Sequence, residues 1–114
     1  MRKLISLSVV FLFAFAIIAQ DKKVLEAEIT VFGNCGMCKN RIEKSVKIKE
    51  VKFAKWDKFS KTLKVAYVSP DITIDSLQQR IAATGHDTEK FKAPDSVYVN
   101  LPDCCLYRNG NNTH

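Results

Sequence analysis

Apolar and polar residues alternate along residues 25–31. The apolar positions are Leu25, Ala27, Ile29 and Val31. A period of two predicts a strand with one buried face. Gly33 and Asn34 follow, and turn-forming residues at this place predict that the strand ends there.

Two later segments have the spacing of amphipathic helices. In residues 37–48 the apolar residues Cys38, Ile42 and Val46 recur every four positions. Charged residues fill most of the remaining positions, which predicts a helix with one buried stripe. A second helix is predicted after Thr73, which can cap its N-terminus, and it ends at Gly85. Its buried stripe consists of Ile74, Leu77 and Ile81.

Strand-like segments at residues 52–56 and 62–67 flank a five-residue loop and predict a hairpin. Residues 86–91 are a weaker candidate for a last strand, because their alternation is poor. The predicted order is strand, helix, strand, strand, helix, strand. This order is typical of an α+β fold with two helices on one face of a four-stranded antiparallel sheet.

The first 19 residues predict a secretory signal peptide, because Arg2 and Lys3 precede an apolar stretch. Cleavage is predicted after Ala16 or Ala19, which leaves a periplasmic or secreted protein without a membrane anchor. A retained N-terminal anchor is the alternative. The chain of 114 residues carries a net charge of +6. Since acidic and basic residues mix along each element, we expect no nucleic-acid partner.

Four cysteines form two close pairs, Cys35 with Cys38 and Cys104 with Cys105. The first pair lies in a predicted domain of residues 20–90, and the second lies in a C-terminal tail of residues 91–114. In an exported protein, an even number of cysteines is typical of disulfides. Bridges within either pair would close very short loops and stabilise little. Cross-pairing of the two couples stays open.

The C-x-x-C pair lies at the predicted start of a helix. Soft thiolates select Cu(I) and Hg(II), and Cu(I) accepts two or three sulfur ligands. The helix N-terminus favours the thiolate form. Zn(II) needs four ligands, which Cys104 and Cys105 complete only if the tail folds back. We therefore expect a Cu(I)-binding protein and not an enzyme, with thiol–disulfide exchange or a structural disulfide as alternatives.

Four further residues are candidate accessory ligands of this site. They are Met37, His86, Cys104 and Cys105. Met37 offers a thioether between the two cysteines, although a core role suits methionine as well. His86 follows the second helix, in a loop that is expected to return to the sheet edge that carries Cys35.

Three segments carry a resemblance to a known family. They are the sequence GNCGMC at residues 33–38, the spacing of Val51, Ala54 and Trp56 before a hairpin, and Ile81 four residues before Gly85. With these segments the chain resembles the heavy-metal-associated domain family, which includes copper chaperones, modules of copper-transporting ATPases and periplasmic mercury-binding proteins.

The resemblance implies a ferredoxin-like fold and a soft ion held by Cys35 and Cys38. It also implies a monomer that hands the ion by ligand exchange to a copper-transporting ATPase or another envelope metal-binding protein. Two positions depart from the family pattern. Gly33 replaces the usual Met, and His86 replaces the usual Tyr, Phe or Lys.

Overall fold

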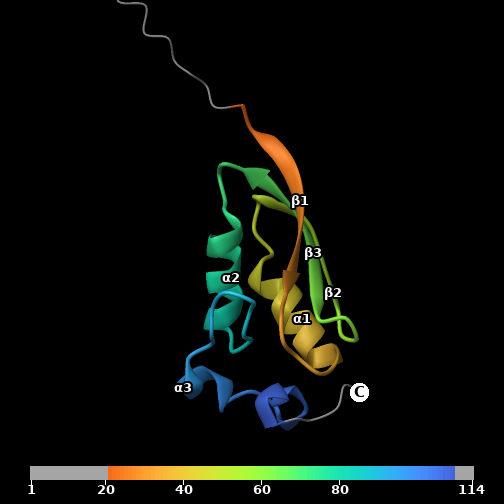
Figure 1. Ribbon diagram of the computed structural model, residues 1–114, viewed down its shortest axis with the longest axis vertical. Helices are drawn as coiled ribbons and strands as arrows, with labels where there is room; N and C mark the ends of the chain where they lie inside the picture. The colour runs from red at the N-terminus through yellow and green to blue at the C-terminus, as the bar shows by residue number, and fades with distance from the viewer. Residues whose placement is uncertain (1–20, 110–114) are drawn as a thin grey trace, which may run out of the picture.

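A computed structural model describes residues 21–109 as a three-stranded antiparallel sheet with two main helices on one side (Figure 1). The main elements are β1 (Lys23–Thr30), α1 (Gly36–Ser45), β2 (Val51–Asp57), β3 (Thr62–Ser69) and α2 (Ile74–Ala83). The central strand is β3, which pairs with both β1 and β2. The predicted α+β class is confirmed, with both helices on one face.

Residues 1–19, the predicted signal peptide, lie outside the described residues. Within residues 21–109, no helix has the length and apolar character that a membrane span requires.

Local contacts account for the start and end of α2 and for the end of α1. At the start of α2, the Thr73 hydroxyl accepts a hydrogen bond from the Ser76 amide at 3.1 Å, as an N-cap residue does. Gly85 follows α2 with φ of 111°, a conformation that suits glycine. Helix α1 ends at Ser45, before the predicted end at residue 48. The amide of Lys47 bonds the carbonyl of Lys44 instead of one four residues back, which closes the last turn.

The predicted fourth strand is reduced to one antiparallel bridge between Thr88 and Val31 in the described residues. Thr88 instead closes a turn, because its amide donates to the Phe91 carbonyl at 2.8 Å and its hydroxyl accepts from the Phe91 amide at 3.0 Å. The same hydroxyl donates to Gln78 of α2 at 2.8 Å. These local bonds compete with an extended strand, so residues 86–91 follow the end of β1 without forming a ladder.

The core lies between the sheet and the two helices. Its largest fully buried side chains include Trp56, Ile29, Ile42, Leu63, Leu77 and Ile81. The described part of the tail, residues 91–109, forms α3 (Asp95–Tyr98) and two short 3₁₀ turns, η1 (Asp103–Cys105) and η2 (Tyr107–Asn109). Tyr98, Leu101 and Cys105 belong to the same buried cluster as the core. The tail therefore packs against the fold through these three residues.

Candidate metal centre

Four cysteine sulfurs meet at the N-terminus of α1. The Sγ atom of Cys35 lies 3.4 Å from that of Cys38, 3.0 Å from that of Cys104 and 3.4 Å from that of Cys105. The two tail sulfurs are 3.8 Å apart. All four residues are free thiols in this structure. The two cysteine pairs, 66 or more positions apart in sequence, thus form one sulfur cluster.

Three of these sulfurs form a compact group. The Sγ atoms of Cys35, Cys38 and Cys105 all lie within 4.8 Å of one another. Cys38 and Cys105 are fully buried, and Cys35 is 7% exposed. Cys104 is partly exposed, and its thiol contacts the Met37 sulfur at 3.6 Å. The cluster therefore has a buried side and an open side.

The backbone places the first two cysteines at this corner. Cys35 is the N-cap residue of α1 with an extended backbone, and its carbonyl accepts from the Lys39 amide at 3.0 Å. Cys38 lies in the first turn of α1, where its sulfur accepts from the Asn34 amide at 3.5 Å. Amides at a helix N-terminus favour negative charge, so this placement favours thiolates.

The Trp56 side chain explains why glycine stands at position 33. A Cβ atom on Gly33 would lie 3.0 Å from the Cβ of Cys38 and 3.1–3.2 Å from two ring atoms of Trp56. The Trp56 indole donates to the Val31 carbonyl at 2.9 Å, which holds the ring in place. The indole therefore fills the space under the loop, and a side chain at position 33 would require Cys38 or the Trp56 ring to shift.

Cys35 has a lowered pKa, in contrast to the two tail cysteines. Its partial burial disfavours the thiolate, but hydrogen bonds from the Cys104 thiol, the Cys38 amide and the Cys105 thiol outweigh that effect. Together they lower the pKa of Cys35 from 9.0 to about 7. Near neutral pH, the metal-free cluster thus contains a thiolate on Cys35, to which the tail thiols donate hydrogen bonds.

The two tail cysteines keep their protons. Burial, followed by the hydrogen bonds to Cys38 and Cys35, raises the pKa of Cys105 far above its usual value. The hydrogen bond to Cys35 raises the pKa of Cys104, with burial adding to the effect. Arg41 faces the cluster, and its Nη1 atom donates to the Cys105 sulfur at 3.6 Å. A positive side chain is therefore present where further negative charge would develop.

His86 is fully buried, outside the compact group of three sulfurs. Its Nδ1 atom lies 2.8 Å from the Phe32 carbonyl, so Nδ1 carries the proton and donates it. Its Nε2 atom is buried without a hydrogen-bond partner. Burial is the largest cause that lowers the pKa of His86 from 6.5 to about 4. The structure thus places a neutral imidazole under the loop that precedes Cys35.

The tail is fastened beside the sulfur cluster by its last described residues. The Arg108 side chain donates to both carboxylate oxygens of Asp87, at 2.7 and 3.0 Å, and to the Ala93 carbonyl at 2.8 Å. The hydroxyl of Tyr107 donates to the Gly85 carbonyl at 2.8 Å and accepts from the Asp87 amide at 2.7 Å. We call Asp87, Tyr107 and Arg108 the latch.

The latch is largely shielded from water. The side chains of Arg108 and Asp87 are each 19% exposed. Burial alone would raise the pKa of Asp87, but the hydrogen bonds from Arg108 outweigh it and lower that pKa below 3.8. Since bidentate charged hydrogen bonds are among the strongest in proteins, the latch fastens the segment after η1 to the loop that follows α2.

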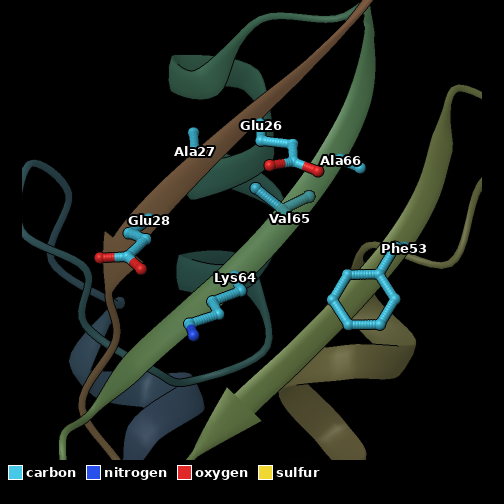
Figure 2. Close-up of a pocket in the computed structure, with 7 residues that line it drawn as sticks. All are labelled: Glu26, Ala27, Glu28, Phe53, Lys64, Val65 and Ala66. Carbon is cyan, nitrogen blue, oxygen red and sulfur yellow. The ribbon is translucent and has the colours of Figure 1, made fainter.

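A separate surface pocket lies over the three strands of the sheet. Its lining residues are Glu26, Ala27 and Glu28 of β1, Phe53 of β2, and Lys64, Val65 and Ala66 of β3. In Figure 2 the side chains of Glu26, Glu28 and Phe53 project from the sheet, with helices behind it. No sulfur lines the pocket, so it is unrelated to the cysteine cluster.

Sequence reasoning named all four cysteines but left open whether the two pairs meet. Tyr98 and Leu101, two apolar residues shortly before Cys104, are the sequence signal that the tail packs on the fold. Arg108, Tyr107 and Asp87 were missed. A single arginine and a single tyrosine near the chain end carry no local pattern, so only the folded chain reveals the latch.

Three solved structures resemble this chain. The CopZ metallochaperone has a TM-score of 0.54 and 23% identity, over 56% of this chain and 98% of its own. The N-terminal domain of a potential copper-translocating P-type ATPase from Bacillus subtilis, solved in the Cu(I)-loaded state, has a TM-score of 0.54 and 28% identity, over 58% of this chain and 85% of its own. A candidate copper-ion-binding protein from Bacillus anthracis str. Ames has a TM-score of 0.53 and 30% identity, over 60% of this chain and 97% of its own.

No family profile and no curated protein matches the sequence. The fold and the corner that carries Cys35 and Cys38 define a ferredoxin-like domain with a C-x-x-C site, as the resemblance implied. The chain belongs to the heavy-metal-associated domain family.

Proposed function

We propose that the protein is an exported Cu(I) carrier in which Cys35 and Cys38 bind the ion as thiolates. The observation that carries this proposal is the convergence of free thiols at one helix N-terminus. Soft sulfur ligands select Cu(I) over hard cations, and the low pKa of Cys35 lets the ion displace protons near neutral pH. Hg(II) and Zn(II) are weaker candidates for the same ligands.

The structural neighbours support copper as the ion. One neighbour is named a metallochaperone, and another is an ATPase domain that was solved with Cu(I) bound. We propose that this protein acts as a monomer and passes Cu(I) to such an ATPase domain or to another envelope metal-binding protein. Export is part of the proposal and rests on the sequence of the first 19 residues.

Anaerobic titration of the reduced protein against a chromophoric Cu(I) chelator tests the site. Cys35→Ser and Cys38→Ser should each weaken Cu(I) binding strongly, because either change removes one of two thiolates. Ser96→Ala, at an exposed tail position, is a control that should leave the affinity unchanged. Unchanged affinity in both cysteine variants would refute the proposed site. The intact mass of protein from the cell envelope tests export, since cleavage after Ala16 or Ala19 gives distinct masses.

Thiol–disulfide exchange is the second candidate function. One observation favours it: Cys35 has a pKa of about 7, and the Cys104 sulfur lies only 3.0 Å away. An insulin-reduction assay with dithiothreitol separates the two functions. A carrier should reduce insulin no faster than dithiothreitol alone, whereas an exchange catalyst should show turnover that depends on Cys35.

A further inference from the structure

The tail brings a third sulfur to the site, in addition to the two of the C-x-x-C pair. In the compact group, the Cys105 sulfur lies 3.4 Å from that of Cys35 and within 4.8 Å of that of Cys38. Metal–thiolate bonds are about 2.3 Å long for zinc, and a trigonal site with bonds of that length has sulfur atoms about 4 Å apart. The three sulfurs therefore already have nearly the spacing of a three-coordinate soft-metal site.

We infer that Cys105 is a third thiolate ligand of the Cu(I) ion that Cys35 and Cys38 hold, so that the tail closes the site. This inference rests on the proposed function and adds a ligand to it. Cu(I) accepts three sulfur ligands. When the ion binds, three Cu–S bonds form, and each sulfur that was protonated releases its proton to solvent.

Burial and charge distinguish Cys105 from its neighbour Cys104. The Cys105 side chain is fully buried in the core cluster, and Arg41 donates to its sulfur at 3.6 Å. A Cu(I) ion with three thiolates carries a net charge of two minus, which a nearby guanidinium offsets in part. Cys104 is partly exposed and faces Met37, whose side chain is half exposed. Cys104 thus lies at the open side of the site.

The latch makes this third ligand part of the folded protein. Arg108, which is three residues after Cys105, donates two hydrogen bonds to Asp87 in the loop that follows α2. The short turn η1 contacts α1, which carries Cys38. Figure 1 shows the tail passing below the helices, next to the end of α1 that follows β1. Because its position is set by these contacts, Cys105 needs no large rearrangement to reach the ion.

Cu(I) affinity and X-ray absorption of the full chain test the inference, with Cys104→Ser as the matched control for Cys105→Ser. Changes outside the first ligand shell already weaken metal binding about 10–100-fold, so Cys105→Ser should weaken Cu(I) binding at least about tenfold. The number of sulfurs around copper should fall from three to two. Cys104→Ser should keep both the affinity and three sulfurs.

A second variant guards against misfolding of Cys105→Ser. Arg108→Ala leaves every cysteine in place but frees the tail, and it should also weaken Cu(I) binding. The inference would be overturned by two sulfurs around copper in the unchanged protein, or by a loss of affinity in Cys104→Ser in place of Cys105→Ser. A four-sulfur Zn(II) site that binds in preference and needs both tail cysteines would also overturn it. If Cys105→Ser leaves Cu(I) affinity unchanged while Cys35→Ser and Cys38→Ser weaken it, the inference fails and the proposed function stands. If Cys35→Ser and Cys38→Ser also leave Cu(I) affinity unchanged, the proposed function fails.

Discussion

The buried imidazole of His86 should make the metal-free protein less stable in mild acid. Its pKa is about 4 in the folded chain, against an ordinary value of 6.5. Between these two values the unfolded chain binds a proton that the folded chain does not, so stability falls as the pH falls through this window. With these values, lowering the pH from 7 to 5 should cost about 2 kcal/mol of unfolding free energy.

Other titrating groups contribute little in this window. The pKa values of Asp57 and Asp87 are lowered from 3.8, so their contributions are lost only in stronger acid. The pKa of Cys35 is lowered from 9.0 to about 7, so the stability that it contributes develops mainly above pH 7. A change in stability between pH 5 and 7 therefore reports mainly on His86.

Urea unfolding of the reduced, metal-free protein at pH 5 and 7 measures the effect. His86→Asn keeps an N–H donor for the Phe32 carbonyl but cannot titrate, so it should be less stable at pH 7 and nearly independent of pH. His114→Asn makes the same change at the other histidine of the chain. Equal stability of the unchanged protein at the two pH values, or an undiminished loss in His86→Asn, would refute the reasoning.

Two further predictions concern the loop and the latch. Gly33→Ala should destabilise the protein by about 1–3 kcal/mol in urea unfolding, because its Cβ would crowd Cys38 and Trp56. Gly36→Ala is the control, because its Cβ meets nothing within 4 Å. An equal effect of the two changes would contradict the packing argument. Arg108→Ala should cost about 2–4 kcal/mol because it leaves the shielded Asp87 carboxylate unpaired, and a loss no larger than that of the same change at an exposed arginine would show that the latch is weak.

Much of the fold could be predicted because each main element has a local pattern. The alternation before Gly33 places every second side chain on one buried face of a strand. The four-residue spacing of Cys38, Ile42 and Val46 places these side chains on one buried face of a helix. The fourth strand was predicted wrongly in extent, because the side chain of Thr88 bonds Gln78 and Phe91 instead of leaving its segment extended. Such bonds depend on partners that a local pattern does not reveal.

The candidate site likewise has features that the sequence predicts and features that only the fold reveals. The spacing of Cys35 and Cys38 at a predicted helix start was sufficient to propose a soft-metal ligand pair. The reason for glycine at position 33 appears only when the Trp56 indole from β2 is seen beneath the loop. The role of His86 likewise depends on its burial and on the Phe32 carbonyl that its ring bonds.

The amino-acid sequence alone determined the first three strands, the two main helices and the pair of thiols at a helix N-terminus, since these features arise from neighbours along the chain. Only the tertiary structure decided that Cys104 and Cys105 join that pair. Their approach depends on contacts between distant residues, above all those of Arg108 with Asp87 and of Leu101 with the core. No spacing in the sequence encodes such contacts, because they form only when the tail and the loop after α2 pack together.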